Sequence, residues 1–136
     1  MEPPLAHMER ARFIAHKDAQ VLLIDLGGLV GRELFDVLGV AAKVIRAQPL
    51  DSVLTVIDAA TLEITLRDGQ GGYDRTLTDR LRGFTSGSRE FVRAGAVVVG
   101  TDESKRVIAE FINNISERAL IIFETRNEAL DWLVDQ

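Results

Sequence analysis

Two aspartates, Asp25 and Asp58, stand at the ends of apolar segments and are the side chains best placed for chemistry. Asp25 lies in the apolar segment 21–26, and Asp58 directly follows the segment 53–57. Apolar segments of this length are typical of strands that are buried on both faces of a parallel sheet. Sites in open α/β sheets are built at the carboxyl ends of the strands. The two carboxylates could therefore bind Mg²⁺ together at one edge of a sheet.

A receiver-like phosphoacceptor would use such a pair of acids, and it is the third of our functional hypotheses. Receiver domains also need a double acid after the first strand and a lysine after the last strand. Here Asp25 stands alone before Leu26 and Gly27, and the last predicted strand leads into Glu124 and Thr125. A turn contact or a helix cap made by each aspartate is the interpretation that the sequence favours.

The residues that follow Asp58 carry almost no reactive groups. Alanines occupy positions 59 and 60, where a nucleophile or a phosphoacceptor would stand, and Thr61 is the only nearby hydroxyl. A second segment, 101–105, also follows an apolar strand, and its acids suit the positive end of a helix dipole. The two segments would meet at one edge of the sheet and form a surface that a partner recognises. We expect this surface to include Asp58, Ala59, Thr61, Thr101 and Lys105.

A group of arginines in the middle of the chain gives a second candidate surface. Arg75, Arg82 and Arg89 are spaced by seven residues and would share one side of a helix that ran so far. Such a stripe, with Arg75 and Arg82 in the helix, could bind an acidic partner or a lipid phosphate. Acids such as Asp79 are interleaved, so pairing between residues three apart on a solvated face is the simpler interpretation.

The histidines and the glycine-rich segment give weaker signals. Neither His7 nor His16 has a carboxylate or hydroxyl partner at a recognisable spacing, so we expect surface or edge-strand histidines. The segment 68–72 could hold a phosphate through its backbone N–H groups. It lacks the Lys-Ser/Thr of a P-loop, so a flexible connection is the prediction.

Composition excludes several classes of protein. The chain has 136 residues, no cysteine and a formal net charge of −5. Disulfides, thiolate chemistry and cysteine-based zinc sites are therefore excluded, and general nucleic-acid binding is not expected without a basic surface. No apolar run approaches the roughly 20 residues of a membrane span, and the N-terminus does not match a secretory signal. These features indicate a cytoplasmic protein without a metal or organic cofactor.

The pattern of apolar residues predicts one α/β domain, residues 12–136, after a flexible leader, residues 1–11. Predicted strands cover 12–17, 21–26, 53–57, 62–67, 94–100 and 120–123, with 62–67 as an edge strand or an extended connection. Predicted helices begin at 32, 73, 107 and 126, and Pro49 ends the first of them. Thr125 and Glu128 fit a capping box in front of the last helix. The expected architecture is a sandwich-like sheet of four to five mostly parallel strands flanked by about four helices.

Three segments of this chain are similar to one protein family. They are Val53-Leu-Thr-Val-Ile-Asp58, Phe91-Val-Arg-Ala-Gly-Ala-Val-Val-Val-Gly100 and Ile122-Phe-Glu-Thr-Arg-Asn-Glu-Ala-Leu-Asp-Trp-Leu133. On these segments the chain resembles the SpoIIAA-like group of STAS/SEC14-type domains, small bacterial α/β modules related to anti-sigma-factor antagonists. The resemblance covers roughly residues 12 to 135, and its motifs are short and mainly structural.

The resemblance implies regulation through protein–protein contacts, or the binding of an apolar ligand. In the antagonist branch a phosphorylatable serine follows the strand-end acid, in a pattern like Asp-Ser-Ser-Gly-Leu. That pattern falls here on residues 58–62, so Ala59 occupies the position of the phosphoacceptor and has no hydroxyl. In a shifted register Thr61 could be an acceptor. The resemblance therefore implies a family member without the serine switch.

The sequence thus leaves three hypotheses. The first is a non-catalytic regulatory or protein-interaction module whose partner is a signalling protein. The second is a small binding protein for a lipid or another apolar molecule, and the third is the receiver-like phosphoacceptor that uses Asp25 and Asp58. An exposed edge strand at 62–67 could also pair across a homodimer.

Overall fold

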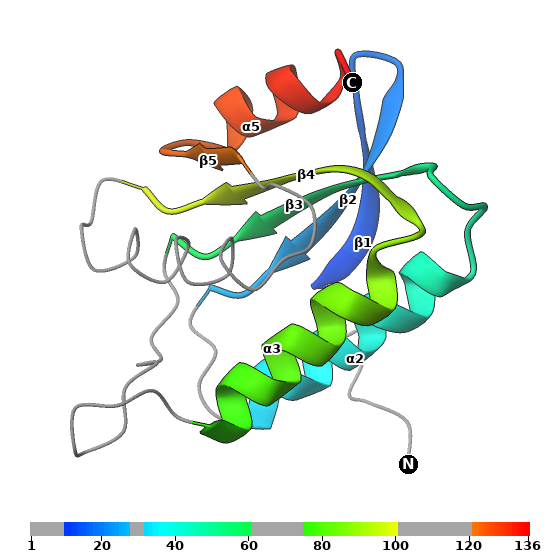
Figure 1. Cartoon of the computed structure of the whole chain (residues 1–136). Coiled ribbons are helices and arrows are strands. Elements are labelled where there is room, and N and C mark those ends of the chain that lie inside the picture. The colour runs from blue at the N-terminus through cyan, green and yellow to red at the C-terminus, as the bar shows by residue number, and fades with distance from the viewer. Residues whose placement is uncertain (1–9, 28–31, 61–74, 101–120) are drawn as a thin grey trace.

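The computed structural model describes residues 10–27, 32–60, 75–100 and 121–136, and these form a five-stranded mixed sheet between helices (Figure 1). The strands are β1 (Ala11–His16), β2 (Ala19–Asp25), β3 (Val53–Asp58), β4 (Val92–Val98) and β5 (Ile121–Phe123). The helices are α2 (Arg32–Arg46), α3 (Arg75–Ser88) and α5 (Arg126–Leu133). The α/β class that the sequence predicts is confirmed.

Strands β1 and β2 form the hairpin that the sequence indicated. They are antiparallel, and the register pairs His16 with Ala19 across a two-residue turn. Both turn residues have positive φ angles, 48° at Lys17 and 68° at Asp18. Two-residue turns of this kind match the right-handed twist of the flanking strands. Strand β1 begins at Ala11, one residue before the start at residue 12 that the sequence predicted for this strand.

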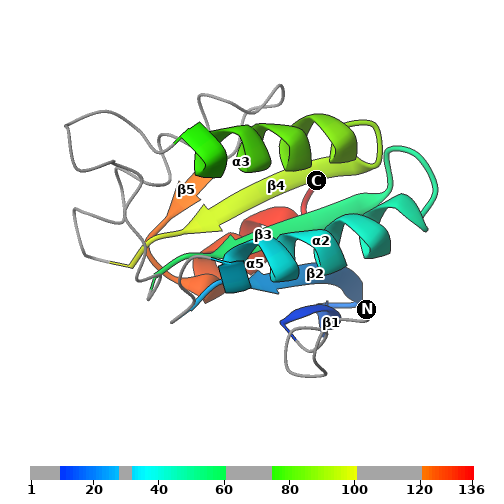
Figure 2. The ribbon, with the colours of Figure 1, turned by 90° about the horizontal axis from the view of Figure 1, so that it is seen from below.

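The spatial order of the strands follows their order in the sequence. The order is β1-β2-β3-β4-β5, and β2 to β5 are parallel. Right-handed crossovers that all advance in one direction across a sheet place their helices on the same face. Accordingly α2 and α3 lie side by side on one face, and α5, which follows the last strand, covers the other face (Figures 1 and 2).

Because helices cover both faces, the sheet has two cores. The α2-side core includes Leu22, Ile24, Ile45 and Ile57. The α5-side core consists of Val21, Leu23, Val56, Ala96, Val98, Ala129, Leu130 and Leu133. Successive strand residues alternate between the two cores, which explains why the central strands are continuously apolar.

Most predicted elements agree with the structure to within a few residues. The predicted edge strand 62–67, the glycine-rich segment 68–72 and the helix beginning at 107 lie outside the described residues. Three helices are therefore described, against the four predicted. No helix in the described ranges is long and apolar enough to cross a membrane.

Candidate interaction surface at the carboxyl ends of the strands

The sheet brings Asp25 and Asp58 side by side at its carboxyl edge. The parallel register pairs Asp25 with Asp58, Asp58 with Val98, and Val98 with Phe123. Residues paired in this way project to the same face, and Val98 and Phe123 belong to the α5 side. One row across four strands therefore carries two carboxylates next to two apolar side chains.

The Asp58 carboxylate is held by Arg126, the first residue of α5. Its Oδ2 accepts hydrogen bonds from Nε of Arg126 at 3.0 Å and from Nη2 at 2.7 Å. Its Oδ1 accepts one from the backbone N–H of Ala60 at 3.1 Å. The Asp58 side chain is 14% exposed and that of Arg126 is 42% exposed. Arg126 thus compensates a mostly buried charge and remains accessible itself.

The start of α5 fixes the position of Arg126. Thr125 is the N-cap residue, and its Oγ1 accepts a hydrogen bond from the Glu128 backbone N–H at 3.2 Å. This confirms the predicted cap. The Glu128 carboxylate accepts from the Thr125 hydroxyl at 2.9 Å, a side-chain contact in place of the backbone contact that a capping box predicts. The cap orients the first turn of α5, where Arg126 lies over Asp58.

Asp25 makes the turn contact that the sequence favoured. Its Oδ1 accepts a hydrogen bond from the Gly27 backbone N–H at 2.9 Å. Nη1 of Arg10 donates to the Gly27 carbonyl at 2.6 Å, and the Asp25 N–H donates to the Arg10 carbonyl at 2.7 Å. Both strand-end aspartates therefore hold the backbone where the chain leaves the sheet, and Arg10 supports the end of β2.

Strand order, nearby ligand groups and charge define the surroundings of the acid pair at this edge. Ligand-binding crevices in open α/β sheets form where the strand order reverses, and the order of the five described strands has no reversal. The described residues contain no group of three or more potential metal ligands. Asp58 already has a cation as its partner, supplied by the protein itself.

Ala59 lies on the opposite face from Asp58, because successive residues of an extended chain alternate between faces. Its side chain is fully buried in the α2-side core, and its N–H donates to the Val98 carbonyl at 2.9 Å. The Ala59 methyl group therefore lies in the core and not on the partner surface that was expected to include it. Of the other predicted surface residues, Thr61, Thr101 and Lys105 lie outside the described residues.

The arginine stripe is shorter than its spacing suggested. The backbone of Arg75 begins α3, and its side chain lies outside the described part of the structure. Arg82 is exposed, and its Nη1 lies 3.8 Å from Oδ1 of Asp79, three residues earlier in the helix. The pairing that the sequence favoured is thus present for Arg82. Arg89 follows the end of α3 at Ser88, so the helical stripe does not reach it.

A second polar cluster, which sequence reasoning missed, joins the hairpin turn to α5. The Oδ1 atom of Asp131 lies 2.8 Å from Nε2 of His16 and 2.9 Å from Nζ of Lys17. The hydrogen bonds from His16 and Lys17 hold the pKa of Asp131 below its ordinary value. His16 therefore has a carboxylate partner 115 residues away, which no local spacing could reveal.

Comparisons of the chain with protein-family models, with curated proteins and with solved structures give no match. The resemblance to SpoIIAA-like domains therefore rests on the three segments quoted from the sequence. The structure adds the α/β architecture of those segments: one forms β3, one contains β4, and one runs from β5 into α5.

Proposed function

We propose that this protein is a non-catalytic regulatory or protein-interaction module of the STAS/SpoIIAA-like type that lacks the serine switch. The observation that carries the proposal is the pairing of Asp58 with Arg126. The strand-end acid, which a phosphoacceptor or a metal site would need free, instead anchors an exposed arginine at the surface. Arginine is enriched at protein interfaces, because its guanidinium group binds carboxylates with a planar pair of donors.

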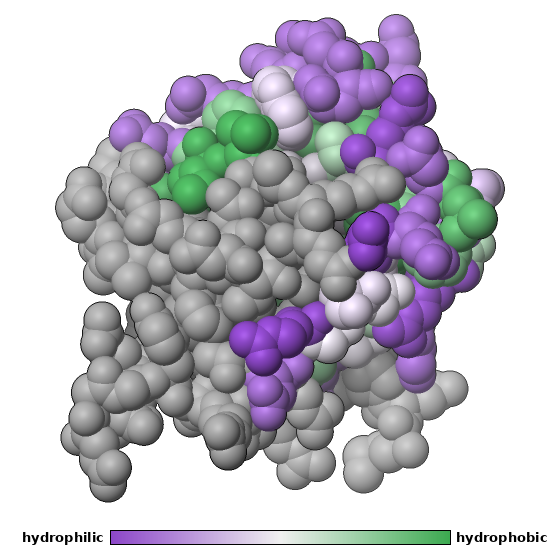
Figure 3. Space-filling view, viewed as in Figure 1, coloured by the Kyte–Doolittle hydropathy of each residue, from purple (hydrophilic) through white to green (hydrophobic). Residues whose placement is uncertain are grey.

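The proposed contact surface is the corner between β5 and the first turn of α5. Ile121 is 41% exposed and belongs to the same face as Phe123, two residues later in β5. Figure 3 shows hydrophobic surface over β5 beside the hydrophilic side chains of α5. Ile121 supplies an exposed apolar side chain and Arg126, five residues later, an accessible guanidinium group, and interface centres combine apolar side chains with arginine. We name this corner, made of Ile121, Phe123 and Arg126, the β5–α5 corner.

Recognition at this corner does not use the serine switch of the family. The Ala59 side chain, at the position of the family's phosphoacceptor, is buried and carries no hydroxyl. A partner would therefore bind this corner without a phosphate at position 59.

The test is affinity capture with a matched pair of variants, Ile121→Arg and Leu50→Arg. Both residues are exposed large apolar side chains, but Leu50 precedes β3 and lies at the end of the sheet opposite Asp58. We expect Ile121→Arg to abolish capture of the specific partner and Leu50→Arg to retain it, with both variants melting cooperatively by circular dichroism. Undiminished capture by Ile121→Arg would refute the proposed corner, and covalent labelling by acetyl phosphate with Mg²⁺ would refute the non-catalytic function.

A further inference from the structure

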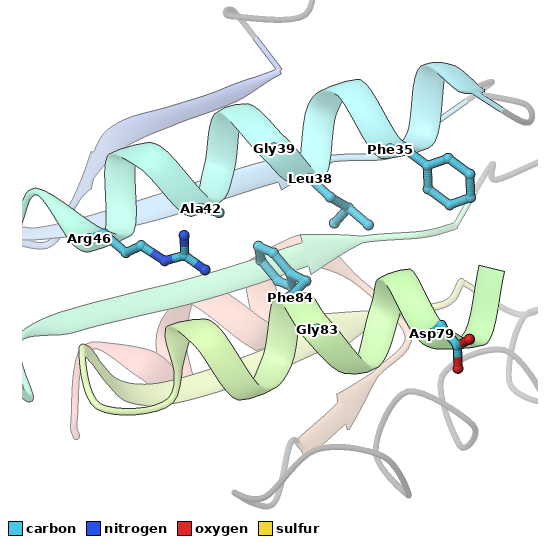
Figure 4. A pocket seen from close by; sticks show the side chains of 8 residues that line it. All are labelled: Phe35, Leu38, Gly39, Ala42, Arg46, Asp79, Gly83 and Phe84. Carbon is cyan, nitrogen blue, oxygen red and sulfur yellow. The ribbon is translucent and has the colours of Figure 1, made fainter. Parts of the chain in front are cut away.

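A groove of about 260 Å³ runs between α2 and α3 on the face opposite α5. The two helices lie side by side in the same direction, and side chains from both face the groove (Figure 4). Three of the lining side chains are large and apolar, namely Phe35, Leu38 and Phe84. The remaining lining residues are Gly39, Ala42, Arg46, Asp79 and Gly83.

The two glycines keep the groove open although packing within the chain does not require them. Gly39 and Gly83 lie in the interiors of α2 and α3, and both are exposed. A Cβ atom added at either position would meet no heavy atom within 4 Å. Glycine is among the least favourable residues in an exposed helix interior. Glycines on both of these neighbouring helices leave space for another surface to approach the backbones of α2 and α3 closely.

Opposite charges stand at the two ends of this groove. At one end Nε of Arg46 donates to the Gly87 carbonyl at 3.4 Å, which places the guanidinium group beside Gly87. At the other end stands Asp79, an exposed carboxylate whose Oδ1 lies 3.8 Å from Nη1 of Arg82. Gly87 is four residues after Gly83 and Asp79 is four residues before it, so the backbone of each lies about 6 Å from Gly83 along the helix axis. The groove therefore has opposite charges at similar distances on either side of Gly83.

We propose that a second copy of this chain occupies the groove and forms a homodimer with two-fold symmetry. The two-fold axis would lie in the plane of the interface and cross α2 and α3 at the level of Gly83. It would bring Arg46 of each copy to Asp79 of the other. The half-buried Phe35 and Phe84 of the two copies would supply the apolar contact, since Leu38 is already buried in the core. One patch is then complementary to itself, as in isologous interfaces. The glycines allow the facing α3 helices to approach closely.

The charges argue against a fatty acid, or another small anion with an apolar tail, as the occupant of the groove. The carboxyl ends of both helices lie at the Arg46 end, and the negative ends of the two helix dipoles there disfavour an anion. Asp79 would repel a carboxylate at the other end. A second copy satisfies both ends at once, because each cation of one copy meets an anion of the other.

Sedimentation equilibrium of the full chain over a wide range of concentration tests the proposal. We expect the wild type to dimerise, Gly83→Arg to remain monomeric at every concentration, and Gly83→Ala to dimerise. Neither substitution meets an atom of its own chain at Cβ, so both variants should fold. A monomeric wild type, or a Gly83→Arg variant that dimerises like the wild type, would overturn the proposal.

A charge exchange then tests the orientation. Arg46→Glu alone should weaken dimerisation about tenfold, since two ion pairs per dimer are replaced by repulsion. The double variant Arg46→Glu/Asp79→Arg should restore most of the loss. Lys43→Glu, an exposed residue of α2 outside the groove, is the control and should leave the equilibrium unchanged. Failure of the double variant to recover, or a copurified ligand on a monomer in native mass spectrometry, would rule out this dimer.

Discussion

Asp58 and Arg126 lie 68 positions apart in the sequence, and Arg126 donates two hydrogen bonds to one carboxylate oxygen of Asp58. The contact ties the carboxyl end of β3 to the first turn of α5. Asp58, which the sequence marked as a candidate for chemistry, therefore has a structural role. Its partner Arg126 remains partly exposed at the surface.

Removal of this arginine should destabilise the protein modestly. In Arg126→Ala, Asp58 keeps its backbone contact to Ala60 but loses its cation, so we expect a loss of about 1 kcal/mol in the free energy of unfolding. Urea denaturation of Arg126→Ala, Asp58→Asn and the double variant gives the coupling energy. We expect about 0.5 to 1 kcal/mol, because Arg126 is well solvated. A coupling energy of zero would show that the pair contributes nothing to stability.

The Asp131 carboxylate should stabilise the folded protein at neutral pH but not in strong acid. His16 and Lys17 lower the pKa of Asp131 from 3.8, so the folded state holds this proton less tightly than the unfolded state. The stabilising contribution is therefore fully present above the unfolded pKa and is lost as pH falls through the lower folded pKa. Thermal melts should show Asp131→Asn below the wild type at neutral pH, with the difference vanishing in strong acid. Asp135→Asn, an exposed acid nearby in the chain, serves as the control.

A serine at position 59 should destabilise the fold. The Ala59 side chain is fully buried in the α2-side core, so a hydroxyl group there would lose its hydration. We expect Ala59→Ser to lower the free energy of unfolding by about 1 to 3 kcal/mol. Ala60→Ser, at the neighbouring half-buried position, should cost less. Equal costs for both variants in urea denaturation would contradict the burial of Ala59.

Two glycine substitutions should change stability in opposite directions. Gly39→Ala replaces an exposed glycine inside α2 with open space in front of it, so we expect a gain of about 1 kcal/mol. Gly100 has a φ angle of +69°, so Gly100→Ala should cost about 1 to 2 kcal/mol, because side chains disfavour this conformation. Melts at low protein concentration separate these effects from dimerisation. A destabilised Gly39→Ala would mean that some contact within the chain needs the glycine.

The elements were predictable because their signals are local. Continuous apolar runs revealed β3 and β4, a stripe of apolar residues revealed α2, and Thr125 with Glu128 marked the start of α5. The turn contacts of Asp25 and Asp58 were also predictable, since each aspartate hydrogen-bonds to a backbone N–H only two residues later.

The partners of the site residues were not predictable, because they come from distant parts of the chain. The residues around Arg126 in the sequence do not indicate that it contacts Asp58. The residues around Asp131 likewise do not indicate that it contacts His16. The stretch 58–61 also looked like one surface in the sequence. The structure separates Asp58 from Ala59, since adjacent residues at a strand end point to opposite faces.

The sequence by itself determined the α/β class, the hairpin, the crossover pattern and the absence of a hydroxyl at position 59. These follow from residue type and periodicity, which act over a few neighbouring residues. Only the tertiary structure decided that an arginine holds Asp58, that Ala59 is buried, and that α2 and α3 form a groove with opposite charges at its ends. Each of these depends on strand register and helix placement, which bring together residues that the chain keeps far apart.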